Sequence, residues 1–311
     1  MTAAISTQKL TRRFGRTVAL DAVDLEVPEG AVYALVGANG AGKTTLIKVL
    51  MNIFCPTAGS AHVMGADSRK VAGKIFNRIG YVSENQQLPD WMSTGEMLAY
   101  FRNFYPGWDI SLEHSLIRQF DLPLKRKLKH LSRGMRMKAA FASSLAYRPR
   151  LIVLDEPFSG LDPLVRDELI EGLIDRAPET TIFLSSHDLA EIEGFASHVG
   201  FLEQGRLLSS EEMAVLSNRF RTVTVTLAAP QPLPADLPPN WLQVEASDRV
   251  VRFVDSAYEP AASPAQFAAI FPSARDIPLD PMSLRSIFLA IAKSKRGTGQ
   301  SPALTPQLAN Q

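Results

Sequence analysis

The order of apolar and polar stretches along the chain predicts a domain in which strands and helices alternate. An alternating run over 18–27 and an apolar run over 31–36 are typical of a half-buried and a buried strand. Apolar residues three and four positions apart predict a helix over 44–53. Further elements are predicted in this order: strand 79–82, helices within 94–121 that break at Pro106 and Gly107, helix 132–146, strand 151–154, helix 164–176, strand 181–184, helix 189–195 and a hairpin over 201–208. This alternation indicates an α/β domain.

The pattern changes near residue 215, where a second, smaller module begins. Its predicted elements are a strand over 221–227, a loop over 228–240 with five prolines, a strand over 250–254 and a helix over 283–292. We therefore expect domain boundaries at 1–215 for the α/β domain and 216–295 for the small α+β module. Residues 296–311 contain no aromatic residue and are expected to form a disordered tail.

Composition narrows the classes of protein that fit this pattern. The chain has 33 basic and 32 acidic residues, a net charge of +1 that provides no bulk attraction to nucleic acid or to an anionic membrane. The longest apolar stretches are strand-sized, far from the ~18 residues that a membrane span requires. A single cysteine, Cys55, excludes an internal disulfide and a cysteine-cluster metal site.

The clearest candidate for a functional site is a glycine-rich segment between the strand 31–36 and the helix that follows it. Its sequence, Gly-Ala-Asn-Gly-Ala-Gly-Lys-Thr, matches the spacing GxxxxGK[ST] of phosphate-binding loops. Glycines let successive backbone N–H groups turn toward phosphate oxygens, and the amino end of the helix favours the same anion. Lys43 is expected to contact the β- and γ-phosphates, and the Thr44 hydroxyl to bind Mg²⁺. The expected nucleotide-binding residues are Gly37, Asn39, Gly40, Ala41, Gly42, Lys43, Thr44 and Thr45.

Two carboxylates follow the buried strand 151–154. In an open α/β sheet, ligands bind beyond the carboxyl ends of the strands, so Asp155 is expected beside the Mg²⁺ that Thr44 holds. Glu156 is then placed to polarise a water for attack on the γ-phosphate, as general base or as a water-orienting group. Either carboxylate alone would more often be a solvated strand end.

Together these segments resemble the nucleotide-binding subunit of an ATP-binding cassette (ABC) transporter of the bacterial export type, over about residues 5–215. The motifs follow the family's order: the phosphate loop at 37–45, LSRGM at 131–135 where the family has its signature LSGGQ, the acidic strand end at 151–156, SGLDP at 159–163 as the D-loop, and SSHD at 185–188 as the switch histidine region. The resemblance implies a P-loop NTPase cassette with a mixed-sheet core and a helical subdomain at about 90–148.

The resemblance also implies roles for single residues. His187 is expected to sense the γ-phosphate, and Phe14, placed before the first strands, is expected to stack on adenine. In this family two cassettes pack head to tail and enclose ATP between one phosphate loop and the other signature helix. Ser132, Gly134 and Asp162 are therefore expected to belong to the nucleotide site. A serine at a helix start is, by itself, more often only a helix cap.

The chain departs from the family pattern at the signature and at the glutamine loop. Arg133 and Met135 stand where the signature has glycine and glutamine, and Arg133 brings a positive charge that either helps or obstructs the incoming phosphates. Glu84 occupies the usual glutamine position. A carboxylate can still ligate Mg²⁺, so Glu84 is carried over as a metal ligand, with Gln86 and Gln87 as nearby substitutes.

The function implied by the resemblance is an ATPase with ATP and Mg²⁺ as cofactors. Two cassettes, in a homodimer or a heterodimer, would drive a separate polytopic membrane permease, with the chain in the cytoplasm and peripheral on the inner face of the membrane. Export rather than import follows by analogy only. The alternative is a soluble ABC-type ATPase that acts on nucleic acid or ribosomes. No nucleic-acid partner is expected, because the chain has one cassette and no heptad insert. A cassette that binds ATP without turnover is a third hypothesis, against which Glu156 and His187 argue.

Overall fold

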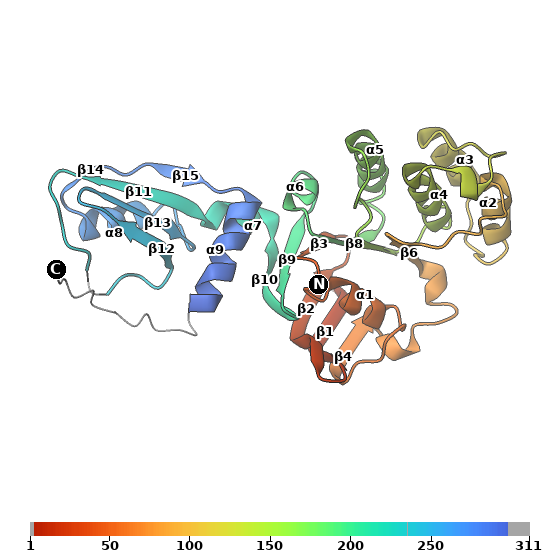
Figure 1. Ribbon diagram of the computed structural model, residues 1–311, viewed down its shortest axis with the longest axis horizontal. Coiled ribbons are helices and arrows are strands. Elements are labelled where there is room, and N and C mark those ends of the chain that lie inside the picture. Colours follow the sequence, from red (N-terminus) through yellow and green to blue (C-terminus); the bar gives the residue numbers. More distant parts are fainter. Residues whose placement is uncertain (1–2, 235, 298–311) are drawn as a thin grey trace, which may run out of the picture. The chain divides into compact units, whose positions relative to one another are not determined.

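The computed structural model describes residues 3–234 and 236–297, and the chain divides into two compact units between Met213 and Ala214 (Figure 1). The first unit contains the alternating strands and helices and confirms the α/β class that the sequence predicts. The second unit is a small sheet with helices. Among the described residues, no helix is long and apolar enough to cross a membrane.

The centre of the first unit is a six-stranded sheet with the order β10-β9-β3-β8-β7-β6. Five of the strands run parallel and β10 pairs antiparallel with β9, so the sheet is mixed. The bounds are β3 (Val32–Val36), β6 (Ile79–Ser83), β7 (Leu151–Asp155), β8 (Thr181–Ser186), β9 (His198–Glu203) and β10 (Arg206–Glu212). Because parallel strands end at the same edge, the residues after β3, β6, β7 and β8 come together there.

A second sheet of the first unit is antiparallel and has the order β2-β1-β4-β5. Its bounds are β1 (Ala3–Phe14), β2 (Thr17–Pro28), β4 (Ala58–Val63) and β5 (Ala66–Asp67). The sequence predicts neither β4 nor the full length of β1. Phe14 is the last residue of β1, which corrects the expectation that it precedes the first strands.

Helices cover both faces of the six-stranded sheet. Figure 1 shows α5 and α6 on one side, and α1 with the antiparallel sheet on the other. The bounds are α1 (Lys43–Leu50), α2 (Thr94–Arg102), α3 (Ile110–Gln119), α4 (Arg133–Leu145), α5 (Pro163–Ile174) and α6 (Leu189–Ile192), with 3₁₀ turns at Ser68–Lys70, Phe76–Arg78 and Leu128–His130. The predicted break at Pro106 and Gly107 is confirmed between α2 and α3. One apolar cluster, which includes Leu35, Leu46 and Val63, joins α1 to both sheets.

The second unit is built on a sheet with the order β12-β13-β11-β14, in which β15 also pairs with β11. The bounds are α7 (Met213–Arg219), β11 (Arg221–Leu227), β12 (Trp241–Ala246), β13 (Val250–Asp255), α8 (Ser263–Ile270), β14 (Ala274–Asp276), β15 (Leu279–Pro281) and α9 (Leu284–Gly297). Trp241 stacks on Phe253 with a centroid distance of 3.9 Å. The predicted tail begins inside α9, which corrects its start, and residues 298–311 lie outside the described residues.

Candidate functional site

The glycine-rich segment forms a tight loop between β3 and α1. A Cβ atom at Gly37 would stand 2.2 Å from the carbonyl oxygen of Leu202, and one at Gly42 would stand 2.6 Å from that of Ala19. Gly42 also has a φ of 112°, which L residues rarely adopt. The loop therefore requires glycine at both positions. It places the amino end of α1 next to the carboxyl edge of the sheet, where helix N–H groups favour an anion.

Lys43 lies inside this loop with a side chain that is only 5% exposed. Its Nζ donates to the carbonyl oxygen of Gly37 at 2.6 Å and to that of Ala38 at 3.2 Å. The same ammonium lies 3.0 Å from Oε1 of Glu156. The cation from the phosphate loop and the carboxylate from the end of β7 therefore meet, as the sequence analysis expects of one site.

Glu156 stands at the first position after β7 in a strained conformation. Its φ of 51° is unusual for a residue other than glycine, and such strain is typical of functional sites. Its Oε2 lies 2.8 Å from Nδ1 of His187, which follows β8. This hydrogen bond to Glu156 is the largest of the effects that raise the pKa of His187 above its ordinary value. Both predicted catalytic residues are thus in direct contact.

Asp155 is buried at the end of β7 and accepts two hydroxyl groups on one oxygen. The Thr44 hydroxyl donates to Oδ1 at 3.0 Å, and the Ser185 hydroxyl donates to the same atom at 2.9 Å. Burial raises the pKa of Asp155, and these hydrogen bonds oppose the rise. Ser185 also accepts the backbone N–H of Glu156 at 3.0 Å, so it holds the carboxylate of Asp155 and the backbone of Glu156. Ser185 lies in the switch histidine segment, but no role of its own is predicted for it from the sequence.

The side chains of Thr44 and Asp155 fit a magnesium ion. Both supply oxygen ligands, and a buried carboxylate with a raised pKa gains from a nearby cation. The described residues include no cluster of three His, Cys, Asp or Glu side chains that could hold a metal by themselves.

Glu84 follows β6, and its carboxylate is held by residues other than the expected metal ligands. Its backbone N–H donates to the carbonyl oxygen of Asp155 at 2.9 Å. Its Oε1 accepts from Arg133 at 2.8 Å and from the hydroxyl of Ser159 at 3.0 Å. The backbone of Glu84 is therefore beside the site, while its carboxylate joins the start of α4 and the loop before α5.

Ser132, Gly134 and Asp162 each have a role within this chain. The Ser132 hydroxyl accepts the N–H of Met135 at 3.2 Å and caps α4, and Asp162 caps α5 by accepting the N–H of Val165 at 3.1 Å. A Cβ atom at Gly134 would stand 3.1 Å from a methyl carbon of Val165, so Gly134 allows α4 and α5 to approach. The role that the sequence analysis gives these residues in a second cassette's site stays a prediction.

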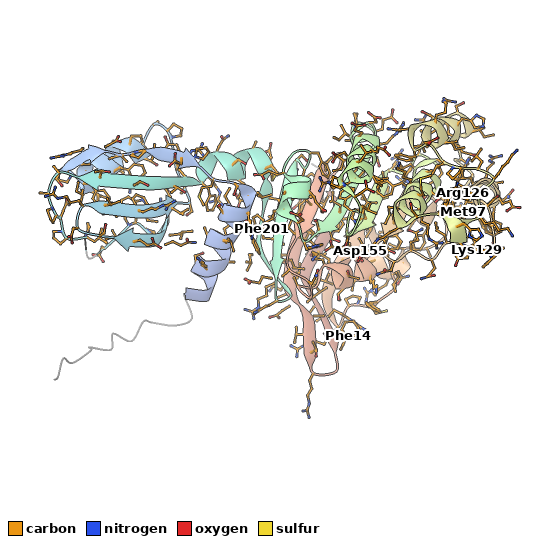
Figure 2. The ribbon with its side chains drawn as sticks, turned by 45° about the horizontal axis from the view of Figure 1, so that its top comes forward. Phe14, Met97, Arg126, Lys129, Asp155 and Phe201 are labelled. Carbon is orange, nitrogen blue, oxygen red and sulfur yellow. The ribbon has the colours of Figure 1, made fainter. Side chains whose placement is uncertain are left out.

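Phe14 lies on the antiparallel sheet, apart from Asp155 (Figure 2). Its ring is 40% exposed and packs edge-to-face on Phe54, with centroids 5.2 Å apart. The guanidinium of Arg12 lies 4.4 Å from the ring centroid. The other predicted loop residues take positions that fit phosphate binding: Asn39 and Gly40 are exposed, Ala41 is buried, and Thr45 lies in the first turn of α1.

Comparison with known proteins identifies relatives of this chain. The sequence profile of the family described as ABC transporter matches residues 20–159. The bacitracin transport ATP-binding protein BcrA of Enterococcus faecalis is 32% identical, over 71% of this chain and 73% of that protein. The lantibiotic transport ATP-binding protein SrtF of Streptococcus pyogenes is 34% identical, over 66% of this chain and 89% of that protein.

Solved structures share the fold. A structure described as the ATP-binding subunit of an ABC transporter has a TM-score of 0.64 and 27% identity, and the match covers 70% of this chain and 92% of that one. An ATP-binding cassette solved as a dimer in a post-hydrolysis state, bound to ADP and Pi, has a TM-score of 0.60 and 20% identity, over 67% of this chain and 98% of that one. The second likeness concerns the fold alone.

Proposed function

Since this chain belongs to the family of ABC transporter ATP-binding subunits, we propose that its site binds MgATP and hydrolyses it between two cassettes. The chain is an ATPase subunit that energises an ABC transporter. Its named relatives are transport ATP-binding proteins, which sets aside the alternative of a soluble ATPase that acts on nucleic acid.

The observation that carries the proposal is the convergence of Lys43, Glu156 and His187. These side chains come from α1, the end of β7 and the end of β8, and they are linked by contacts of 3.0 and 2.8 Å. A cation can bind the phosphates, and a carboxylate can accept a proton from the attacking water, so this set of groups is suited to phosphoryl transfer to water. They stand beside the loop that supplies N–H groups to phosphate, so binding and chemistry share one edge of the sheet.

In the proposed reaction, the phosphates of ATP compete with Glu156 for the ammonium of Lys43. The loop N–H groups and Lys43 hold the β- and γ-phosphates, which leaves Glu156 free to accept a proton from water. The water oxygen attacks the γ-phosphorus, and the bond to the bridging oxygen of ADP breaks. We propose that His187, which contacts Glu156, binds the γ-phosphate and keeps the base oriented.

Mg²⁺ would be held by Thr44 and Asp155, and when bound it would neutralise charge on the β- and γ-phosphates. The pair of hydroxyls on Asp155 Oδ1 keeps that carboxylate aimed at the loop. Glu84 joins this set only if its carboxylate leaves Arg133. We therefore propose Thr44 and Asp155 as the primary protein ligands.

We propose a second cassette as partner, and this chain would supply Ser132, Gly134 and Asp162 to the nucleotide bound by that cassette. The fold neighbour solved as a dimer with ADP and Pi supports such an arrangement. A polytopic permease is the second proposed partner and would hold the chain at the inner face of the membrane. The relatives named for bacitracin, lantibiotic and multidrug transport support an export-type system.

The substitution Glu156→Gln tests the proposal because it keeps the side-chain shape and removes the base. Steady-state hydrolysis should fall by about 10²-fold or more, while ATP binding measured by calorimetry persists. Trapped dimers should appear on size exclusion in the presence of ATP. Glu171→Gln, on the exposed face of α5, serves as the matched control and should leave turnover unchanged. Near-normal turnover in Glu156→Gln would show that a residue other than Glu156 acts as the general base.

A further inference from the structure

An ion pair absent from the family's usual motifs connects the loop after β6 to the start of α4. Nη2 of Arg133 lies 2.8 Å from Oε1 of Glu84, and the Ser159 hydroxyl donates to the same oxygen at 3.0 Å. The carboxylate thus joins three segments that border the nucleotide site. Both members of the pair are departures from the family pattern, since glutamine and glycine are usual at these positions.

The loop before α5 is shaped to accept the guanidinium. Gly160 has a φ of 64°, and a Cβ atom there would stand 3.0 Å from Nη1 of Arg133. Any side chain at Gly160 would therefore crowd the arginine as well as strain the backbone. Gly160 lies next to Ser159, so one short segment both binds Glu84 and leaves room for Arg133.

The ion pair between Arg133 and Glu84 is exposed enough for Arg133 to exchange Glu84 for another anion. The Arg133 side chain is 49% exposed and that of Glu84 is 34% exposed, and ion pairs at such exposed positions contribute little to stability. A guanidinium binds phosphate through two parallel hydrogen bonds, and a triphosphate carries more negative charge than one carboxylate. Arg133 is also the first residue of α4, where the helix dipole favours an incoming anion. A phosphate is therefore a stronger partner for Arg133 than Glu84 is.

We propose that Arg133 exchanges Glu84 for the terminal phosphate of the nucleotide bound by a second cassette. This inference rests on the composite site proposed above and adds a residue to it. Glu84 acts as an internal competitor that occupies Arg133 until a triphosphate displaces it, so the pair sets the ATP concentration at which two cassettes join. Arg133 contributes a contact that ADP, which lacks the terminal phosphate, cannot provide.

Exchange of the Arg133 partner and a purely structural role of the ion pair predict different effects of substitution. If the pair only holds two loops together, Glu84→Gln and Arg133→Gly both break it and should change dimer formation in the same direction. If the exchange operates, Glu84→Gln removes the competitor and favours the dimer, whereas Arg133→Gly removes the phosphate contact and disfavours it. The two single variants should therefore have opposite effects.

The experiment uses the full chain carrying Glu156→Gln, so that ATP is not consumed, and measures the ATP concentration at half-maximal dimer by analytical ultracentrifugation. Adding Glu84→Gln should lower that concentration about two- to fivefold, the range for an exposed ion pair. Adding Arg133→Gly should raise it about tenfold or more, the range for a lost charge-assisted hydrogen bond. Arg133→Lys should recover part of the loss, because it restores the charge without the planar fork.

A second exposed ion pair on the same helix supplies the control. Arg136 Nη1 lies 2.6 Å from Oδ1 of Asp90, and Asp90→Asn should leave the ATP concentration unchanged. Shifts in one direction for both single variants, or no shift in either, would overturn the exchange while leaving the composite site intact. Failure of Glu156→Gln alone to dimerise with ATP would instead overturn the composite site, and the exchange with it.

Discussion

Nζ of Lys43 lies 3.0 Å from Oε1 of Glu156, although the two residues are 113 positions apart in the chain. The lysine belongs to the phosphate loop and the glutamate to the acidic end of β7. Their contact ties the group that would bind the phosphates of ATP to the group that would activate water. In the proposed mechanism, a nucleotide that binds Lys43 also releases Glu156, so substrate binding would activate the base.

Lys43→Ala should weaken ATP binding by about tenfold or more, because it removes a charged donor from the β- and γ-phosphates. Calorimetry of ATP binding gives the affinity directly. Lys70→Ala, at an exposed position in the 3₁₀ turn Ser68–Lys70, is the matched control and should bind ATP normally. An unchanged ATP affinity in Lys43→Ala would show that Lys43 does not bind the nucleotide.

The contact between His187 and Glu156 should make stability depend on pH. Because the folded protein raises the pKa of His187, protonation stabilises the fold below the ordinary histidine pKa, and this contribution is lost as the pH rises through the raised value. The melting temperature of the unsubstituted chain should exceed that of His187→Asn by more at about pH 6 than at about pH 8.5. The exposed His114→Asn provides the control. A difference that grows with pH would contradict the assignment.

The second unit should depend on its aromatic core. Trp241 stacks on Phe253 and lies near the ring of Phe271, so Trp241→Ala should lower the local free energy of unfolding by about 3–5 kcal/mol. Hydrogen exchange of the amides in β11 and β13 measures this change. Trp91 is 72% exposed, and Trp91→Ala should change stability by no more than about 0.5 kcal/mol. Equal effects of the two substitutions would show that Trp241 is not a core residue.

Ser132→Ala separates a helix cap from a catalytic contact. The loss of the cap on α4 should cost about 1 kcal/mol of stability in either case. If Ser132 also contacts the nucleotide of a second cassette, hydrolysis should fall steeply while ATP binding by the single chain stays the same. Ser93 caps α2 by accepting the N–H of Glu96 and is not among the predicted site residues, so Ser93→Ala should cost similar stability without loss of hydrolysis. Full activity in Ser132→Ala would show that the signature assignment is wrong.

Local patterns sufficed to predict the elements that build the site. The glycines of the phosphate loop and the apolar run before Asp155 each mark a strand end, and parallel strands bring such ends to one edge. The family resemblance supplied the partners that spacing does not give, above all His187. Its contact with Glu156 joins residues from two different strands, and the structure provides the distance.

Other features depend on contacts that a single sequence does not reveal. The side chain of Glu84 was carried over as a metal ligand, yet its position depends on Arg133 and Ser159, which lie 49 and 75 residues away. The role of Ser185 depends on the register between β7 and β8, which places it opposite Asp155. In the second unit, β12 and α8 escaped prediction because elements of six and eight residues are too short to establish a clear period.

Mixing Lys43→Ala chains with Ser132→Ala chains tests directly whether two cassettes share one nucleotide site. One variant retains a working signature helix and the other a working phosphate loop, so a mixed dimer carries both lesions in one site and none in the other. With subunit exchange verified, we expect two inactive proteins to regain part of the ATPase activity when mixed. A mixture that stays as inactive as its parts would contradict the account.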